Sequence, residues 1–183
     1  MVNKVIILIL LYMKGGTGAR VKEYIQEEAA ICPQPNADKF VIQFPGQLNF
    51  TTGISSVEFH GNFTITDVIQ EPLELVIHIT RCTLDNKTCD QFNKLTLTNI
   101  CRYVNDEKGP LVGFFKSMEP KIRCPIKPGA YRFKNSLVDL SFTTIYPMEG
   151  YRWKAHLKLN SRRPKRELFC VFSQSIMRWT KKT

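Results

Sequence analysis

The chain has 183 residues, about the length of one domain, and its 43% apolar content can bury a single core, which argues against extensive disorder. The formal net charge of +10 favours an anionic partner, such as lipid headgroups or acidic glycans. Nucleic acid is not an expected partner, because the chain begins with the pattern of an export signal.

Residues 1–19 have the features of a secretory signal peptide. Lys4 precedes an apolar run from Val5 to Met13, and Thr17 and Ala19 stand at the spacing that a signal peptidase prefers. The alternative is a membrane anchor, but a run of about nine residues is short of the roughly twenty that cross a bilayer. We therefore expect a secreted, extracellular protein, rather than a lysosomal one, with a single mature domain at 20–183.

Three sequons agree with export. Asn49, Asn62 and Asn86 each begin an Asn-x-Thr triplet without an intervening proline. Glycosylation at these positions would place them in solvent.

Short strand-like segments separated by turn residues continue through the mature chain. They lie at 40–44, 53–59, 63–69, 73–81, 131–140, 151–159 and 168–176. Because no helix follows each strand, the pattern favours an antiparallel sandwich or cup over a βαβ sheet. The expected fold is all-β, an immunoglobulin-like antiparallel β-sandwich.

Six cysteines predict three disulfides in an oxidising compartment, with fifteen pairings open. Cys82 and Cys89 could face each other across a hairpin, because an alternating strand leads into the turn TLDNKT. A bond between Cys32 and Cys170 would join the two ends of the domain, which would leave Cys101 and Cys124. A zinc site is the alternative, but no two cysteines lie within four residues of each other, and His60, His78 and His156 are scattered.

The segment 95–118 interrupts the strand pattern. Thr98 could cap a short helix at 99–105, and Gly109-Pro110 would end it. An apolar group follows, containing Leu111, Val112, Phe114, Phe115 and Met118. These side chains could complete the core, or they could form a lid over an apolar cavity.

Residues 151–159 alternate as a half-buried strand does. Tyr151, Trp153 and Leu157 share one face with Ala155 and Leu159, while Arg152, Lys154, His156 and Lys158 share the other. The apolar row, joined by Phe133 and Phe172 if their strands align, could line a ligand cavity. Plain core packing would need the same side chains.

Basic residues continue into the following turn. We expect a membrane-facing patch composed of Arg152, Lys154, Lys158, Arg162, Arg163, Lys165 and Arg166. The alternative is that lysines on an exposed strand prevent edge pairing.

No catalytic, metal-binding or phosphate-cradling motif occurs, so neither an enzyme nor a cofactor is expected. A lipid-directed enzyme of unfamiliar type is the weakest of the alternatives.

The motifs CPIKPGAY (124–131), EGYRWKAHLKL (149–159) and LFCVF (168–172), with the close spacing of Cys82 and Cys89, resemble the ganglioside-activator branch of the ML-type lipid-recognition family. Secreted insect members linked to chemosensory bristles and pheromone response look nearest. The resemblance implies a β-cup whose sheets part around an apolar cavity. It also implies disulfides Cys32–Cys170, Cys82–Cys89 and Cys101–Cys124. A fourth disulfide in the loop region of the ganglioside activator has no counterpart here.

The expected function is therefore a secreted, non-enzymatic protein that carries or presents a lipid or another long apolar molecule. Its partners would be an anionic membrane and a receptor or lipid-handling enzyme. The alternative is an extracellular interaction protein, such as a signalling co-receptor, whose sandwich core is solid.

Overall fold

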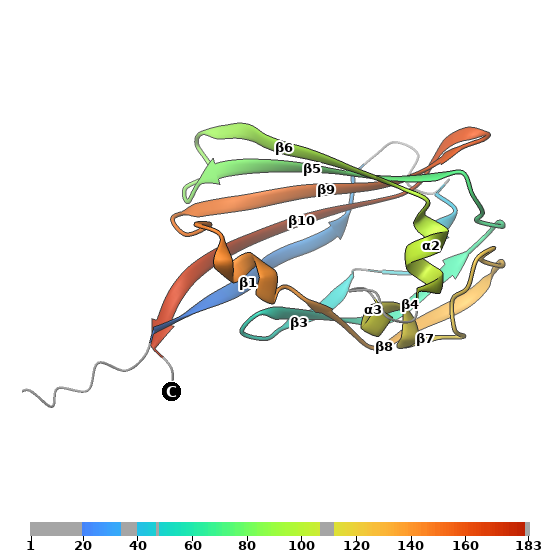
Figure 1. Ribbon diagram of the computed structural model, residues 1–183, viewed down its shortest axis with the longest axis horizontal. Helices are drawn as coiled ribbons and strands as arrows, with labels where there is room; N and C mark the ends of the chain where they lie inside the picture. The colour runs from blue at the N-terminus through green and yellow to red at the C-terminus, as the bar shows by residue number, and fades with distance from the viewer. Residues whose placement is uncertain (1–19, 34–39, 47, 107–111, 182–183) are drawn as a thin grey trace, which may run out of the picture.

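The computed structural model describes residues 20–33, 40–46, 48–106 and 112–181 (Figure 1). The expected signal segment 1–19 and Leu111 lie outside the described residues. No helix among the described residues has the length and apolar character needed to cross a membrane.

Two antiparallel sheets form the fold, and the expected all-β sandwich is confirmed. The long sheet contains, in spatial order, β1 (Arg20–Ile31), β10 (Lys165–Lys181), β9 (Tyr151–Arg162), β5 (Leu73–Thr83) and β6 (Cys89–Thr98). The short sheet contains β2 (Ile42–Gln43), β4 (Ser56–Ile65), β8 (Gly129–Asp139) and β7 (Met118–Glu119), and β3 (Asn49–Thr52) also pairs with β4. Figure 1 shows the long sheet above the short one.

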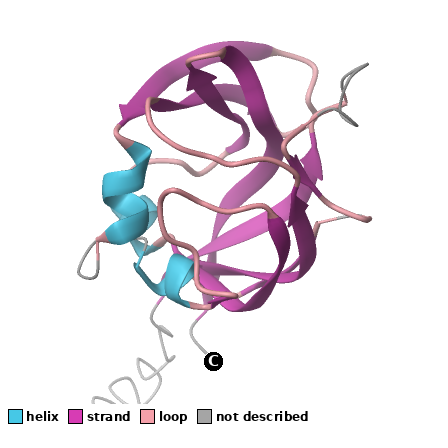
Figure 2. Ribbon diagram, turned by 90° about the vertical axis from the view of Figure 1, so that its right-hand side faces the viewer, coloured by secondary structure: helices cyan, strands magenta, loops and turns pink. Residues whose placement is uncertain are grey.

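The helical segments lie on one side of the two layers, as Figure 2 shows. They are α2 (Ile100–Asn105) and α3 (Val112–Lys116), toward one end of the molecule, and a 3-10 helix (Ser141–Ile145) toward the other (Figure 1). The expected cap at Thr98 is wrong, because Thr98 is the last residue of β6 and the N-cap is Asn99. Asn99 has φ 57° and makes no capping hydrogen bond through its side chain. Asparagine tolerates this left-handed conformation, which turns the chain directly from strand to helix.

Several strands differ from those expected. The segments at 53–59 and 63–69 contribute to one strand, β4, with a register shift between Phe59 and Gly61. The sequence pattern did not predict the long strands β1 and β6. The edge strand β6 is exposed along nearly its whole length, so its polar sequence lacks the apolar alternation of a half-buried strand.

The packed core is divided between the two ends of the sandwich. The larger cluster joins Leu73 and Leu168 of the long sheet to Phe63, Ile65 and Tyr131 of the short sheet. The smaller cluster, at Tyr24, Val57 and Met177, joins β1 and β10 to β4. Each cluster spans both sheets, so the sheets are attached at two separate places.

Three disulfides reinforce the fold, and they have the pairing that the resemblance implied. Cys32–Cys170 links β10 to the residue after β1, Cys82–Cys89 closes the β5–β6 hairpin, and Cys101–Cys124 ties α2 to the segment before β8.

The outer face of the long sheet carries a pair of histidines. His156 of β9 lies directly opposite His78 of β5, and its ring centroid is 5.1 Å from that of Phe172. Burial lowers the pKa of His156 below its ordinary value near 6.5, and the charges of Lys158, His78 and Lys154 lower it further.

Removal of the Cys32–Cys170 bond should destabilise the protein most. The bond spans 138 residues, against 7 for Cys82–Cys89. Loop-closure entropy then predicts losses of about 5 and about 2.5 kcal/mol in unfolding free energy. Denaturant unfolding of the C32S/C170S and C82S/C89S double variants measures both. A larger loss in C82S/C89S would contradict this order.

Protonation of His156 should destabilise the fold. Its pKa is lower in the folded chain than in the unfolded chain, so the unfolded state takes up a proton first as the pH falls. The unfolding free energy should therefore decrease as the pH falls through about 6.5. In H156Q this decrease should be smaller than in wild type or in the control H60Q, as followed by denaturant unfolding between pH 7.5 and 5. An unchanged decrease in H156Q would contradict the assignment.

Candidate functional site: the space between the sheets

The inner face of the long sheet can be followed from its strand register, because cross-strand partners point to the same side. Leu159 pairs with Leu75 on one neighbour and with Phe169 on the other. The ring of Phe169 lies 5.6 Å from that of Phe44, which stacks on Phe63 of the short sheet. This side of the long sheet therefore faces the short sheet.

Two residues further along the strands, the next inner row is aliphatic. Leu157 pairs with Ile77 and with Val171, and Leu95 of β6 lies opposite Ile77. Ile77, Leu157 and Val171 are only half-buried, and Leu95 is 44% exposed. None of the four belongs to the packed clusters found among the described residues.

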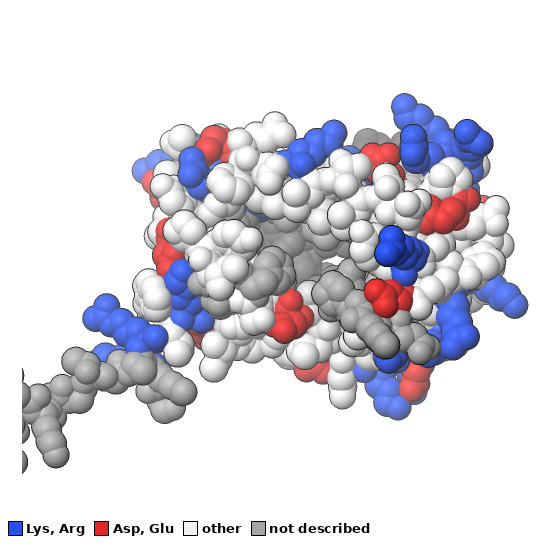
Figure 3. Space-filling view, in the orientation of Figure 1, with Lys and Arg blue, Asp and Glu red and all other residues white. Residues whose placement is uncertain are grey.

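This half-burial is unusual for the middle of a sandwich. In a solid sandwich, the inner faces interdigitate and central side chains lose nearly all solvent contact. Here the row lies between the two packed ends, and Figure 3 shows the surface hollowed midway along the molecule, between the two layers. We call the space next to Ile77, Leu157, Val171 and Leu95 the inter-sheet hollow.

Aromatic rings stand on the opposite side. Phe59 and Phe133 come from the short sheet and Phe114 comes from α3, with ring centroids 5.9 to 6.1 Å apart. All three side chains are half-buried. The hollow therefore has an aliphatic wall on the long sheet and an aromatic wall on the short sheet and α3, so its chemistry suits an apolar ligand.

Near the end of β5, on its inner face, Arg81 lies among three aromatic rings. The guanidinium of Arg81 lies 4.8 Å from the ring of Tyr151 and 5.7 Å from that of Phe92, and it forms a 2.9 Å ion pair with Asp90. The ring of Phe92 is 5.0 Å from that of Trp153. The Nε atom of Arg81 is buried and makes no hydrogen bond with the described residues. Sequence reasoning missed Arg81 and Phe92, although Arg81 continues the alternation of Leu73, Leu75, Ile77 and Ile79.

The expected cavity residues lie in several places. Leu157 lies in the aliphatic wall of the hollow. Phe114 and Phe133, on its aromatic wall, also pack against the larger cluster, to which buried Met118 belongs. Trp153 is buried and donates its indole hydrogen to the Met148 carbonyl at 2.8 Å, and Tyr151 is exposed beside it. Val112 and Phe115 instead line a separate pocket between α2 and α3.

The placement of Phe172 on the cavity wall is wrong. Phe172 pairs with His156, so it lies on the outer face of the long sheet and packs against the cluster of Cys32, Phe40 and Cys170. The register of β10 shifts between Glu167 and Phe169, and this bulge reverses the alternation expected from Leu168.

The expected basic patch is divided along β9. Arg152 lies at the start of the strand and Arg162 at its end, about ten residues or roughly 33 Å away. Lys154 and Lys158 lie between them, and Arg162, Arg163, Lys165 and Arg166 gather at the β9–β10 turn, at the upper right of Figure 3.

Carboxylates offset much of this basic charge. Arg152 pairs with Glu27 at 2.6 Å, Lys158 with Glu167 at 3.1 Å and Arg166 with Asp67 at 2.6 Å. The hydrogen bond from Arg152 lowers the pKa of Glu27, against an opposing effect of burial. The charge available to a membrane is therefore smaller than the sequence implies.

All three sequon asparagines are exposed, with Asn49 in β3, Asn62 in β4 and Asn86 in the β5–β6 turn. Each is therefore accessible to modification, which glycosylation of an exported protein would require.

Within the part of the chain that the structure describes, no three His, Cys, Asp or Glu side chains gather in a way that could hold a metal ion. The chain was compared with protein-family models and with curated proteins, and none of them matches it.

Proposed function

We propose that this protein binds a lipid or another long apolar molecule between its sheets and carries or presents it without catalysis. The observation that carries the proposal is the half-burial of Ile77, Leu157 and Val171 at the centre of the inner face. The resemblance to ML-type proteins supports the same ligand class, including pheromone-like molecules of the insect branch. The three disulfides and the exposed sequons support secretion.

Hydrophobic transfer can supply useful affinity in such a hollow. Each methylene that leaves water for an apolar site contributes about 0.8 kcal/mol. A chain of about twelve carbons thus gains about 10 kcal/mol before the costs of ordering the ligand and the protein. Micromolar binding requires about 8 kcal/mol, so hydrogen bonds to the chain are not essential.

One observation favours the alternative of a protein interaction module. The edge strand β6 is exposed along most of its length, and its outer edge is unpaired among the described strands. Such an edge can accept a strand from a partner protein. Strand addition at this edge would not explain why the apolar side chains at the centre of the inner face are only half-buried, so ligand binding remains the primary proposal.

Filling the hollow should abolish ligand uptake. We expect wild type to bind the apolar fluorophore N-phenyl-1-naphthylamine at micromolar concentration, and I77W and L157W to bind it at least tenfold more weakly, because an indole occupies the space of the ligand. Fluorescence titration measures the affinities, and K154W, on the outer face of the same strand, is the matched control. Equal binding by L157W and K154W would contradict the location.

The hollow should also affect how much unfolding free energy each core substitution removes. Leu73 is 1% exposed in the larger cluster, so L73A should lose about 2 to 5 kcal/mol of unfolding free energy. L157A should lose less than half as much in the ligand-free protein, because half-buried Leu157 already contacts solvent. Denaturant unfolding of delipidated samples gives both values. Equal losses would indicate a solid core.

A further inference from the structure

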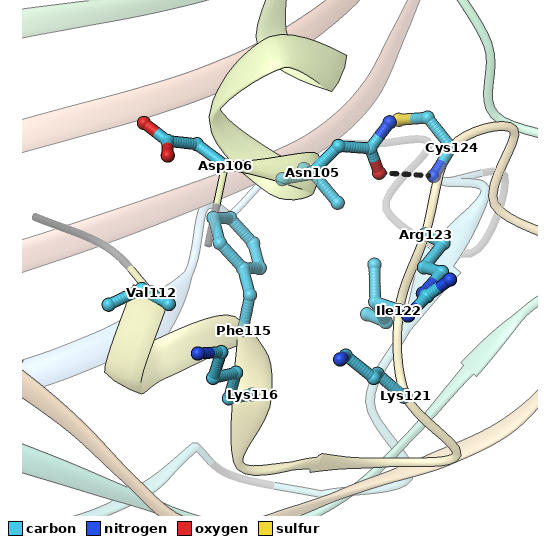
Figure 4. A pocket seen from close by; sticks show the side chains of 10 residues that line it. Asn105, Asp106, Val112, Phe115, Lys116, Lys121, Ile122, Arg123 and Cys124 are labelled. Atoms are coloured by element: carbon cyan, nitrogen blue, oxygen red, sulfur yellow. Dashed lines mark hydrogen bonds between the residues drawn. The ribbon is translucent and has the colours of Figure 1, made fainter. Parts of the chain in front are cut away.

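A second concave site lies outside the inter-sheet hollow, between α2, α3 and the segment 121–124 (Figure 4). We call it the α2–α3 pocket, and its volume is about 320 Å³. Val104 and Ile122, which are 8% and 6% exposed, contribute apolar surface together with Val112 and Phe115. The pocket has room for more than a single small anion.

Covalent and hydrogen bonds fix two walls of the pocket, α2 and the segment 121–124, relative to each other. The Cys101–Cys124 disulfide joins α2 to the segment 121–124. The backbone N–H of Cys124 also donates to the side-chain oxygen of Asn105 at 3.2 Å. Binding here would therefore need little ordering of the backbone, which favours affinity.

The lining of the pocket is cationic. Its described charged residues are Lys116, Lys121 and Arg123, with Asp106 the acid, so the formal charges give a net of +2 (three minus one). In Figure 4, Lys116 and Lys121 flank the lower part of the pocket from α3 and from the segment 121–124, and Arg123 lies beside Ile122.

Two of these cations, Lys121 and Arg123, differ in their partners from Arg132 and Lys134 nearby. Neither Lys121 nor Arg123 makes an ion pair or hydrogen bond through its side chain with the residues the structure describes. On the neighbouring strand β8, Lys134 and Arg132 both bind the carboxylate of Glu119. Bringing like charges together without a carboxylate between them is unfavourable, and an anionic ligand would offset that repulsion.

Aromatic packing connects this pocket to the inter-sheet hollow. Phe115 lines the pocket, and its ring centroid is 5.3 Å from that of Phe114. Phe114 in turn packs edge-on against Phe59, on the aromatic wall of the hollow. One layer of rings therefore separates a cationic pocket from an apolar one.

We propose that the α2–α3 pocket binds the phosphomonoester headgroup of an anionic lipid, with the phosphate at Lys121 and Arg123. A phosphomonoester is a dianion, so its charge matches these two cations better than the single charge of a carboxylate does. The adjoining glycerol carbons would contact Val112 and Phe115. This inference rests on the proposed function, because it takes the headgroup to belong to the lipid whose chain enters the hollow.

A comparison of matched lysolipids tests the proposal. Wild type should bind lysophosphatidic acid at least tenfold more tightly than lysophosphatidylcholine of the same chain length, in isothermal titration at 50 mM NaCl. The preference should shrink at 300 mM NaCl, because salt screens exposed charges. The variants K121E/R123E and K121Q/R123Q should lose the preference. K127E should keep it, because Lys127 is an exposed lysine outside the pocket, between the segment 121–124 and β8.

The following outcomes distinguish failure of the headgroup assignment, of the lipid source and of the proposed function. Equal affinity of wild type for the two lysolipids, or an undiminished preference in both double variants, overturns the headgroup assignment. Glycerol 3-phosphate binding as tightly as lysophosphatidic acid would assign the site to soluble phosphate and overturn the lipid source. Failure of wild type to bind N-phenyl-1-naphthylamine would instead overturn the proposed function, while retained dye binding in the double variants shows that they are folded.

Discussion

Among the described residues, packed side chains join the two sheets at their ends and not along their middle, and the proposed function depends on this constraint. At one end, Phe44 stands between Phe63 of the short sheet and Phe169 of the long sheet, with ring centroids 5.6 Å away on each side. At the other end, Tyr24 packs with Val57 and donates its backbone N–H to the Ile54 carbonyl at 2.8 Å. Between these attachments, the aliphatic row of the long sheet has no packed partner among the described clusters.

This arrangement leaves space between the sheets, and it therefore has less hydrophobic stabilisation than a solid sandwich. Every apolar side chain that stays half-buried forgoes part of the transfer free energy that a solid core would provide. The disulfides offset this loss by restricting the unfolded chain, above all Cys32–Cys170, which spans 138 residues. A bound acyl chain would restore the missing contacts, so ligand binding and stability are linked.

Much of the fold can be predicted from local patterns, because β5 and β9 are half-buried strands with regular alternation. Leu157 was placed on the inner face for that reason, and the register confirms its orientation. Phe172 was misplaced because the bulge in β10 reverses the alternation, and no residue type in LFCVF marks a bulge. Strand β6 was missed because an exposed edge needs no apolar period. The α2–α3 pocket could not be predicted, since a disulfide and a helix bring its walls together from distant positions.

The central claim is that the space between the sheets holds an apolar ligand. Native mass spectrometry of the purified, glycosidase-treated protein tests it, because a lipid retained from the expression host would add a discrete mass to the folded chain. We expect such a mass excess, which should disappear under denaturing conditions and yield an extractable lipid. A folded protein with only its polypeptide mass, which also acquires none after incubation with lysolipids, would contradict the claim.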